Sequence, residues 1–112
     1  MHEMSIAESL VDLIEDEARN ESFTQVRRIA VKIGALGHVE PAALQFCFDV
    51  VARGTVAEGA SLHIETVPGA GWCPRCNRLV AIVQRYDPCP ACGSQVAMTA
   101  GNELRLAELE VE

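Results

Sequence analysis

Apolar residues recur at helical spacing in the first part of the chain. Between residues 4 and 18 they return every three or four positions, which predicts an amphipathic helix. The apolar face of this helix would consist of Ile6, Leu10, Leu13, Ile14 and Ala18. Ser5 followed by Glu8 fits a capping box, so we expect the helix to begin near Ser5.

The pattern then changes to strict alternation. In residues 25–34, Ile29, Val31 and Ile33 alternate with polar or small residues, which predicts a half-buried strand with a polar outer face. Residues 61–67 alternate in the same way and predict a second strand. Between the strands, Pro41 suits the first turn of a second helix, which Gly54 can end. Its apolar positions are Leu44, Cys47, Phe48 and Val51.

The last ten residues alternate again, but their phase slips by one residue at Ala107-Glu108. Such a slip indicates a β-bulge or a change of buried face. A terminal strand needs a sheet partner, and the sheet of the first 68 residues is the simplest one. We therefore predict an α+β fold in which residues 1–68 and 99–112 form a small three-stranded sheet with two helices. Residues 69–98, which follow a Pro- and Gly-rich break, would form an inserted domain.

Four of the five cysteines occur as two Cys-x-x-Cys pairs within this insertion. Cys73 and Cys76 form the first pair, Cys89 and Cys92 form the second, and twelve residues separate the two pairs. Four converging thiolates complete the tetrahedral coordination of Zn²⁺ and leave no open position, so the sequence predicts a structural zinc site in a zinc-ribbon-like β domain. Two redox-active pairs would need a βαβ context that is missing, whereas a mononuclear iron centre would use the same ligands. Cys47 stands alone and is expected to be a buried core thiol.

Charge and hydropathy narrow the range of partners. The 112-residue chain has a formal net charge of −7. Residues 69–98 contain three arginines and one aspartate, a net charge of +2. Four thiolates and one Zn²⁺ would add −2 and make the segment about neutral, so it has no basic stripe that could bind nucleic acid. No apolar run reaches the ~18 residues that a membrane span needs, and the start does not resemble a signal peptide. We expect a soluble cytoplasmic protein that binds neither nucleic acid nor membranes, with cysteines serving as ligands rather than disulfides.

The amino terminus offers a second, chemically different metal site. A free amine on Met1, the amide nitrogen of His2 and the His2 Nδ1 atom can close fused five- and six-membered chelate rings, and Glu3 can add a further donor. Planar nitrogen coordination favours Ni(II) or Cu(II) over Zn(II). Any protein can begin with these residues, so the motif alone is weak. His38 and Glu40 precede the second helix and could face the terminus, although Glu40 also suits the helix dipole there.

Three segments together resemble the HypA/HybF family of hydrogenase nickel-incorporation proteins. They are MHEMSIAESLVDLIEDEA, VKIGALGHVEPAALQFCFDVVARGT and the pair CPRC…YDPCPACGS. The likeness extends from Met1 to Glu112. It implies a nickel-binding domain that carries a zinc domain, as the patterns above also predict.

The resemblance also implies site residues and partners. His2 would be the essential nickel ligand, Met1 and Glu3 would complete the site, and Glu40 could approach the nickel. The zinc ligands of the family match Cys73, Cys76, Cys89 and Cys92. Members of the family work beside the GTPase HypB and deliver nickel to the large subunit of [NiFe]-hydrogenase, and some also serve urease.

The function that follows is metal exchange rather than catalysis. Thiolates would retain Zn²⁺ permanently, while nitrogen donors at an exposed terminus would bind Ni²⁺ reversibly. The sequence contains no nucleophile–base pair, phosphate loop or open catalytic zinc motif, so we do not expect an enzyme. The alternative is a zinc-ribbon module that recruits a protein partner and transfers no nickel.

Overall fold

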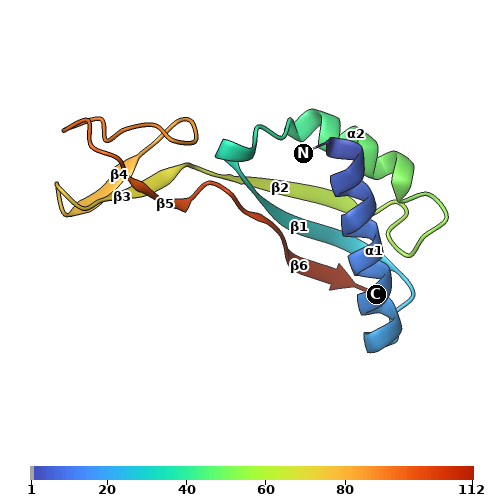
Figure 1. The fold of residues 1–112 in the computed structure, drawn as a ribbon. Helices are drawn as coiled ribbons and strands as arrows, with labels where there is room; N and C mark the ends of the chain where they lie inside the picture. Colours follow the sequence, from blue (N-terminus) through green and yellow to red (C-terminus); the bar gives the residue numbers. More distant parts are fainter. Residues whose placement is uncertain (1) are drawn as a thin grey trace.

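The computed structural model describes residues 2–112 and contains, in that range, two α-helices and two three-stranded sheets (Figure 1). The elements are α1 (Glu3–Glu21), β1 (Val26–Gly34), the 3-10 turn η1 (Ala35–Gly37), α2 (Pro41–Val51), β2 (Ser61–Val67), β3 (Ala70–Cys73), β4 (Arg78–Ala81), β5 (Ala97–Ala100) and β6 (Leu104–Val111). The chain is elongated, with extents of 52 × 25 × 17 Å. The predicted α+β fold class is confirmed.

The larger sheet has the order β2-β1-β6, with β1 parallel to β2 and antiparallel to β6. Both helices lie on one face of it (Figure 1), because the alternating apolar residues of the strands and the apolar faces of the helices form one core. The central members of that core are Ile6, Leu10, Ile14, Ile29, Val31, Leu44 and Phe48. Neither helix of residues 2–112 has the length and apolarity needed to cross a bilayer.

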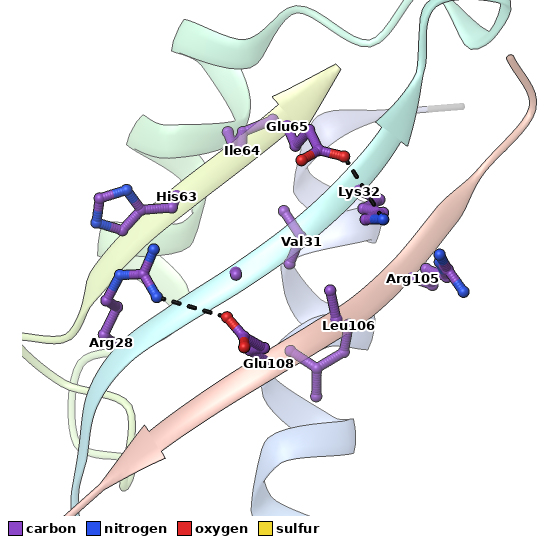
Figure 2. Close-up of a pocket in the computed structure, with 11 residues that line it drawn as sticks. Arg28, Val31, Lys32, His63, Ile64, Glu65, Arg105, Leu106 and Glu108 are labelled. Atoms are coloured by element: carbon purple, nitrogen blue, oxygen red, sulfur yellow. Dashed lines mark ion pairs between the residues drawn. The ribbon is translucent and has the colours of Figure 1, made fainter. Parts of the chain in front are cut away.

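The opposite face of this sheet is open and charged, as the polar outer positions of the strands predict (Figure 2). It forms a shallow hollow of about 710 Å³. Two ion pairs cross the strands there: Arg28 with Glu108 at 3.7 Å, and Lys32 with Glu65 at 3.6 Å. His63, which is not among the predicted nickel or zinc ligands, also lies on this face.

The phase slip in the last strand is a β-bulge. Ala30 pairs with Glu108 and Val31 pairs with Leu106, so Ala107 is an additional residue on β6. The bulge keeps Leu106 and Leu109 on the same face, where both pack against the core. The predicted partner of this strand, the sheet of the first 68 residues, is therefore the one observed.

The smaller sheet has the order β4-β3-β5 and carries its own core. Strand β5 continues to Ala100, two residues beyond the expected end of the insertion. Leu36 of η1 belongs to this second core, although η1 directly follows β1 of the larger sheet. Glycines permit the close chain crossing there: a Cβ at Gly34 would collide with the carbonyl of Gly101, which itself has φ +106°.

The start of the first helix differs from the prediction. Helix α1 begins at Glu3, with His2 as its N-cap, so the expected Ser5–Glu8 capping box is wrong. The Nδ1 atom of His2 accepts a hydrogen bond from the backbone N–H of Met4 at 3.3 Å. This bond satisfies one of the N–H groups that have no partner within the helix at its start. The second helix begins at Pro41 as predicted but ends at Val51, before Gly54.

Candidate metal centres

The first candidate centre consists of the four paired cysteines. Cys73 ends β3, and Cys76 lies in the turn that follows. The carbonyl of Cys73 accepts a hydrogen bond from Asn77 N–H, and the carbonyl of Cys89 accepts one from Gly93 N–H, each at 2.8 Å. Asn77 and Gly93 both have positive φ angles, 56° and 76°. Each pair is therefore held by the same tight knuckle, which turns both sulfurs of a pair to one side.

The distances between the sulfurs fit a tetrahedral metal site. All four Sγ atoms lie within 4.8 Å of one another. The Cys73 and Cys92 sulfurs are 3.6 Å apart, and the Cys76 and Cys89 sulfurs are 3.9 Å apart. A regular tetrahedron with metal–sulfur bonds of ~2.3 Å has edges of about 3.8 Å. Cys73 and Cys89 are buried and the other two are half-buried, so this donor set fits a closed structural Zn²⁺ site.

Hydrogen bonds give the thiols of this cluster different pKa values. The Ser94 hydroxyl and then its backbone N–H donate to the Cys92 sulfur and lower the pKa of that thiol to about 6. The backbone N–H of Cys92 is the main cause of the lowered pKa of Cys89. Cys76 donates to the Cys92 sulfur, and that bond is the main reason that its pKa is raised to about 12. At neutral pH the Cys76 thiol of this cluster is therefore protonated, and a metal ion that binds its sulfur must displace that proton.

The second candidate centre is where the starts of the two long helices meet. A carboxylate oxygen of Glu3, in the first turn of α1, accepts a hydrogen bond from the backbone N–H of Glu40 at 3.3 Å. Glu40 is the N-cap of α2, and its own carboxylate accepts a bond from Ala42 N–H at 3.2 Å. Two carboxylates thus lie beside two helix N-termini, whose exposed N–H groups favour negative charge.

Three of the four predicted nickel-site residues are therefore neighbours. His2 is exposed and directly precedes Glu3, and Glu40 contacts Glu3 although it is 37 residues away in the chain. Met1 lies outside the described residues. Among residues 2–112, only the four cysteines already bring three or more ligand atoms together. At the helix starts, the hydrogen bond from Met4 N–H to the Nδ1 atom of His2 must break before that atom can bind a metal.

Two features of these sites were not predicted from the sequence. The Ser94 bonds to Cys92 could have been suspected, because a hydroxyl two residues after a ligand cysteine is well placed to donate to it. Leu36 connects the two centres: it packs beside Cys73 and Cys89, and it is only four residues before Glu40. The sequence indicated only a turn at that position, since a buried leucine in a Gly-Ala-Leu-Gly segment has no local signal.

Known families and relatives match the chain over its whole length. The model of the family described as "Hydrogenase/urease nickel incorporation, metallochaperone, hypA" matches residues 1–111. The hydrogenase maturation factor HypA of Methylocella silvestris is 58% identical over 113 residues, covering 100% of both chains. The factor of the same name from Azotobacter vinelandii is 53% identical with the same coverage.

Solved structures give the same result. The solution structure of the nickel metallochaperone HypA from Helicobacter pylori is similar with a TM-score of 0.73 and 28% sequence identity, covering 99% of this chain and 97% of that one. A second solution structure of a HypA protein has a TM-score of 0.74 and 29% identity, covering 100% of this chain and 97% of that one.

Proposed function

Because the chain belongs to the HypA family of hydrogenase and urease nickel-incorporation metallochaperones, we propose that it binds Ni²⁺ at its amino terminus and delivers it during the maturation of [NiFe]-hydrogenase. The observation that carries this proposal is the family match over residues 1–111, which includes the terminal Met1-His2-Glu3 segment. The arrangement of the two helix starts supports it, because it gathers oxygen donors next to His2.

The nickel ligands in this proposal are the Met1 amine, the amide and Nδ1 nitrogens of His2, and Glu3, with Glu40 close enough to Glu3 to join them. Binding requires His2 to give up its role as N-cap. Losing an N-cap costs about 0.5–2 kcal/mol, which is small beside the free energy of binding a chelated metal. A site assembled at the cost of one weak hydrogen bond suits a carrier, since the same bond re-forms when the cargo leaves.

The second metal has a different role. We assign Cys73, Cys76, Cys89 and Cys92 to a structural Zn²⁺ that folds the insertion. Zinc would supply the cross-link that the few buried residues around Leu36 and Val80 cannot replace. Soft thiolates at one site and nitrogen and oxygen donors at the other keep the two metals apart.

The family also suggests partners and a compartment. We propose that the protein works with the GTPase HypB and the hydrogenase large subunit, with urease maturation as a further destination in hosts that contain urease. Free thiols that serve as metal ligands stay reduced in the cytoplasm, and we place the protein there.

The proposed delivery can be tested in cells that lack the gene for this protein. The unmodified gene is expected to restore hydrogenase activity at limiting nickel, whereas His2→Ala should leave at most a tenth of it. His63→Ala is the matched control, because it removes a histidine from the open sheet face and should restore full activity. Excess nickel in the medium should narrow the difference between the variants. Full activity of His2→Ala at limiting nickel would contradict the proposal.

A further inference from the structure

Strand β6 leaves one edge of the larger sheet uncovered. It pairs with β1 on one side, and among residues 2–112 no strand pairs with its other side. This edge extends over Leu104–Val111, and it contains no proline. The unpaired N–H and C=O groups of such a strand can form a ladder with another strand.

The bulge gives β6 a side-chain pattern that is the same when it is followed from either end. Leu104, Leu106, Leu109 and Val111 pair with inward-facing residues of β1, and Arg105, Glu108 and Glu110 pair with outward-facing ones. If a second β6 is placed antiparallel with the two-fold axis between Ala107 and Glu108, each residue meets one that faces the same side. Leu104 lies opposite Val111, and Leu106 lies opposite Leu109. Without the bulge this register would place apolar residues opposite charged ones.

The apolar side of this edge is unusually exposed. Leu13 of α1, Leu104 and Val111 keep 45%, 39% and 42% of their surface accessible. Leu13 and β6 border a hollow of about 540 Å³, which is open to solvent beside the strand. A symmetric second copy would cover these residues with its own Leu13, Leu106 and Leu109, so both apolar strips would be buried at once.

The charges on the other side are complementary in the same register. Arg105 lies opposite Glu110 of the second copy, and this pair occurs twice. Within residues 2–112 neither Arg105 nor Glu110 takes part in an ion pair, and Arg105 lies opposite the like charge of Lys32 on the neighbouring strand β1. Glu108, which would lie near the axis, is already paired with Arg28 (Figure 2). The unpaired charges are thus the ones that the second copy would neutralise.

We propose that two copies of this chain pair through β6 into one continuous six-stranded sheet in the order β2-β1-β6-β6-β1-β2. Charged residues and bulges on an edge strand can also serve to prevent pairing. Protection of the edge would not require the charged and apolar residues of β6 to match about a two-fold axis. A dimer in this register requires that match, and β6 has it.

Charge reversal at the two complementary positions tests the register. Sedimentation equilibrium of the zinc-loaded chain should show a monomer–dimer equilibrium. Arg105→Glu and Glu110→Arg, each measured alone, place like charges opposite each other twice and should weaken dimerisation about tenfold or more. An equimolar mixture of the two variants regains both ion pairs and should form heterodimers with about the affinity of the unmodified chain. Hydrogen exchange in residues 104–111 should slow as the concentration rises.

The controls separate this edge from other surfaces. Glu65→Lys reverses a charge on β2, the opposite edge of the same sheet, and should leave dimerisation unchanged. All variants should melt at nearly the same temperature in dilute solution, because the changed side chains are exposed. A chain that stays monomeric at all concentrations, or single variants that dimerise as tightly as the unmodified chain, would overturn the proposal. Mixing that fails to restore pairing would do so as well.

Discussion

Replacing His2 with alanine is expected to abolish specific Ni²⁺ binding, and adding Gly-Ser before Met1 is expected to weaken it at least tenfold. The extension leaves every side chain in place but converts the terminal amine into an amide. It therefore removes one nitrogen donor and opens one of the two fused chelate rings. Isothermal titration and the visible spectrum of the nickel complex measure both effects.

His2 has two roles, and a second variant separates them. Because its Nδ1 atom caps α1, His2→Ala should also cost about 1 kcal/mol of helix stability. His2→Asn retains a good N-cap but has no imidazole, so it should melt like the unmodified chain and still fail to bind nickel. If the extended chain kept both the affinity and the spectrum of the unmodified chain, the nickel site would consist of side chains alone, and the backbone chelate would be refuted.

Replacing Cys76 with alanine is expected to release zinc and to unfold residues 70–98 while the larger sheet and its helices stay folded. Structural zinc contributes about 10–16 kcal/mol in small zinc-binding peptides, and the smaller core has few residues to replace that contribution. Metal analysis gives the zinc content, and hydrogen exchange shows which segments open. Exchange should also rise in η1, since Leu36 would lose its surroundings.

Cys47→Ala is the matched control for this variant. Cys47 packs against the larger core and is remote from the cluster, so its replacement should leave one zinc per chain. Full retention of tightly bound zinc by Cys76→Ala would disprove the four-cysteine assignment.

The proposed zinc site should also bind its metal less tightly as the pH falls. The pKa of Cys76 is raised to about 12, so zinc binding at neutral pH must displace its proton, and each displaced proton lowers the apparent affinity about tenfold per pH unit. The pKa of Cys92 is lowered to about 6, so this thiol adds to the competition only below about pH 6, where the loss should become steeper. Zinc competition with a chelator between pH 8 and 5 measures this slope.

The sequence patterns correctly predicted the features of this protein that depend on residues close together in the chain. The alternation in residues 61–67 gave β2 its observed bounds, and the slip at Ala107 marked a real bulge. The Cys-x-x-Cys spacing predicted sulfurs that the structure brings together. Each of these signals lies within a few residues, where side-chain periodicity or knuckle geometry decides the structure.

Contacts between segments that are far apart in the sequence could not be predicted from such patterns. The Glu3–Glu40 bond joins residues 37 positions apart, and it depends on how two helices pack on one sheet. The N-cap of α1 was misplaced because Ser5 and Glu8 match a common motif, whereas an imidazole cap is rare and depends on the rotamer of His2. Leu36 looked like part of a turn, and only the crossing of three chain segments at Gly34, Gly69 and Gly101 buries it.

Counting both metals in one titration tests the central claim most directly. Ni²⁺ is added to the zinc-loaded chain with its native, unextended terminus, and nickel and zinc are then measured in the protein after gel filtration. If the chain is a nickel carrier with a separate structural zinc, it should hold one nickel and one zinc. A chain that keeps one zinc and no nickel would be the interaction module instead, and nickel that displaces the zinc would contradict the separation of the two sites.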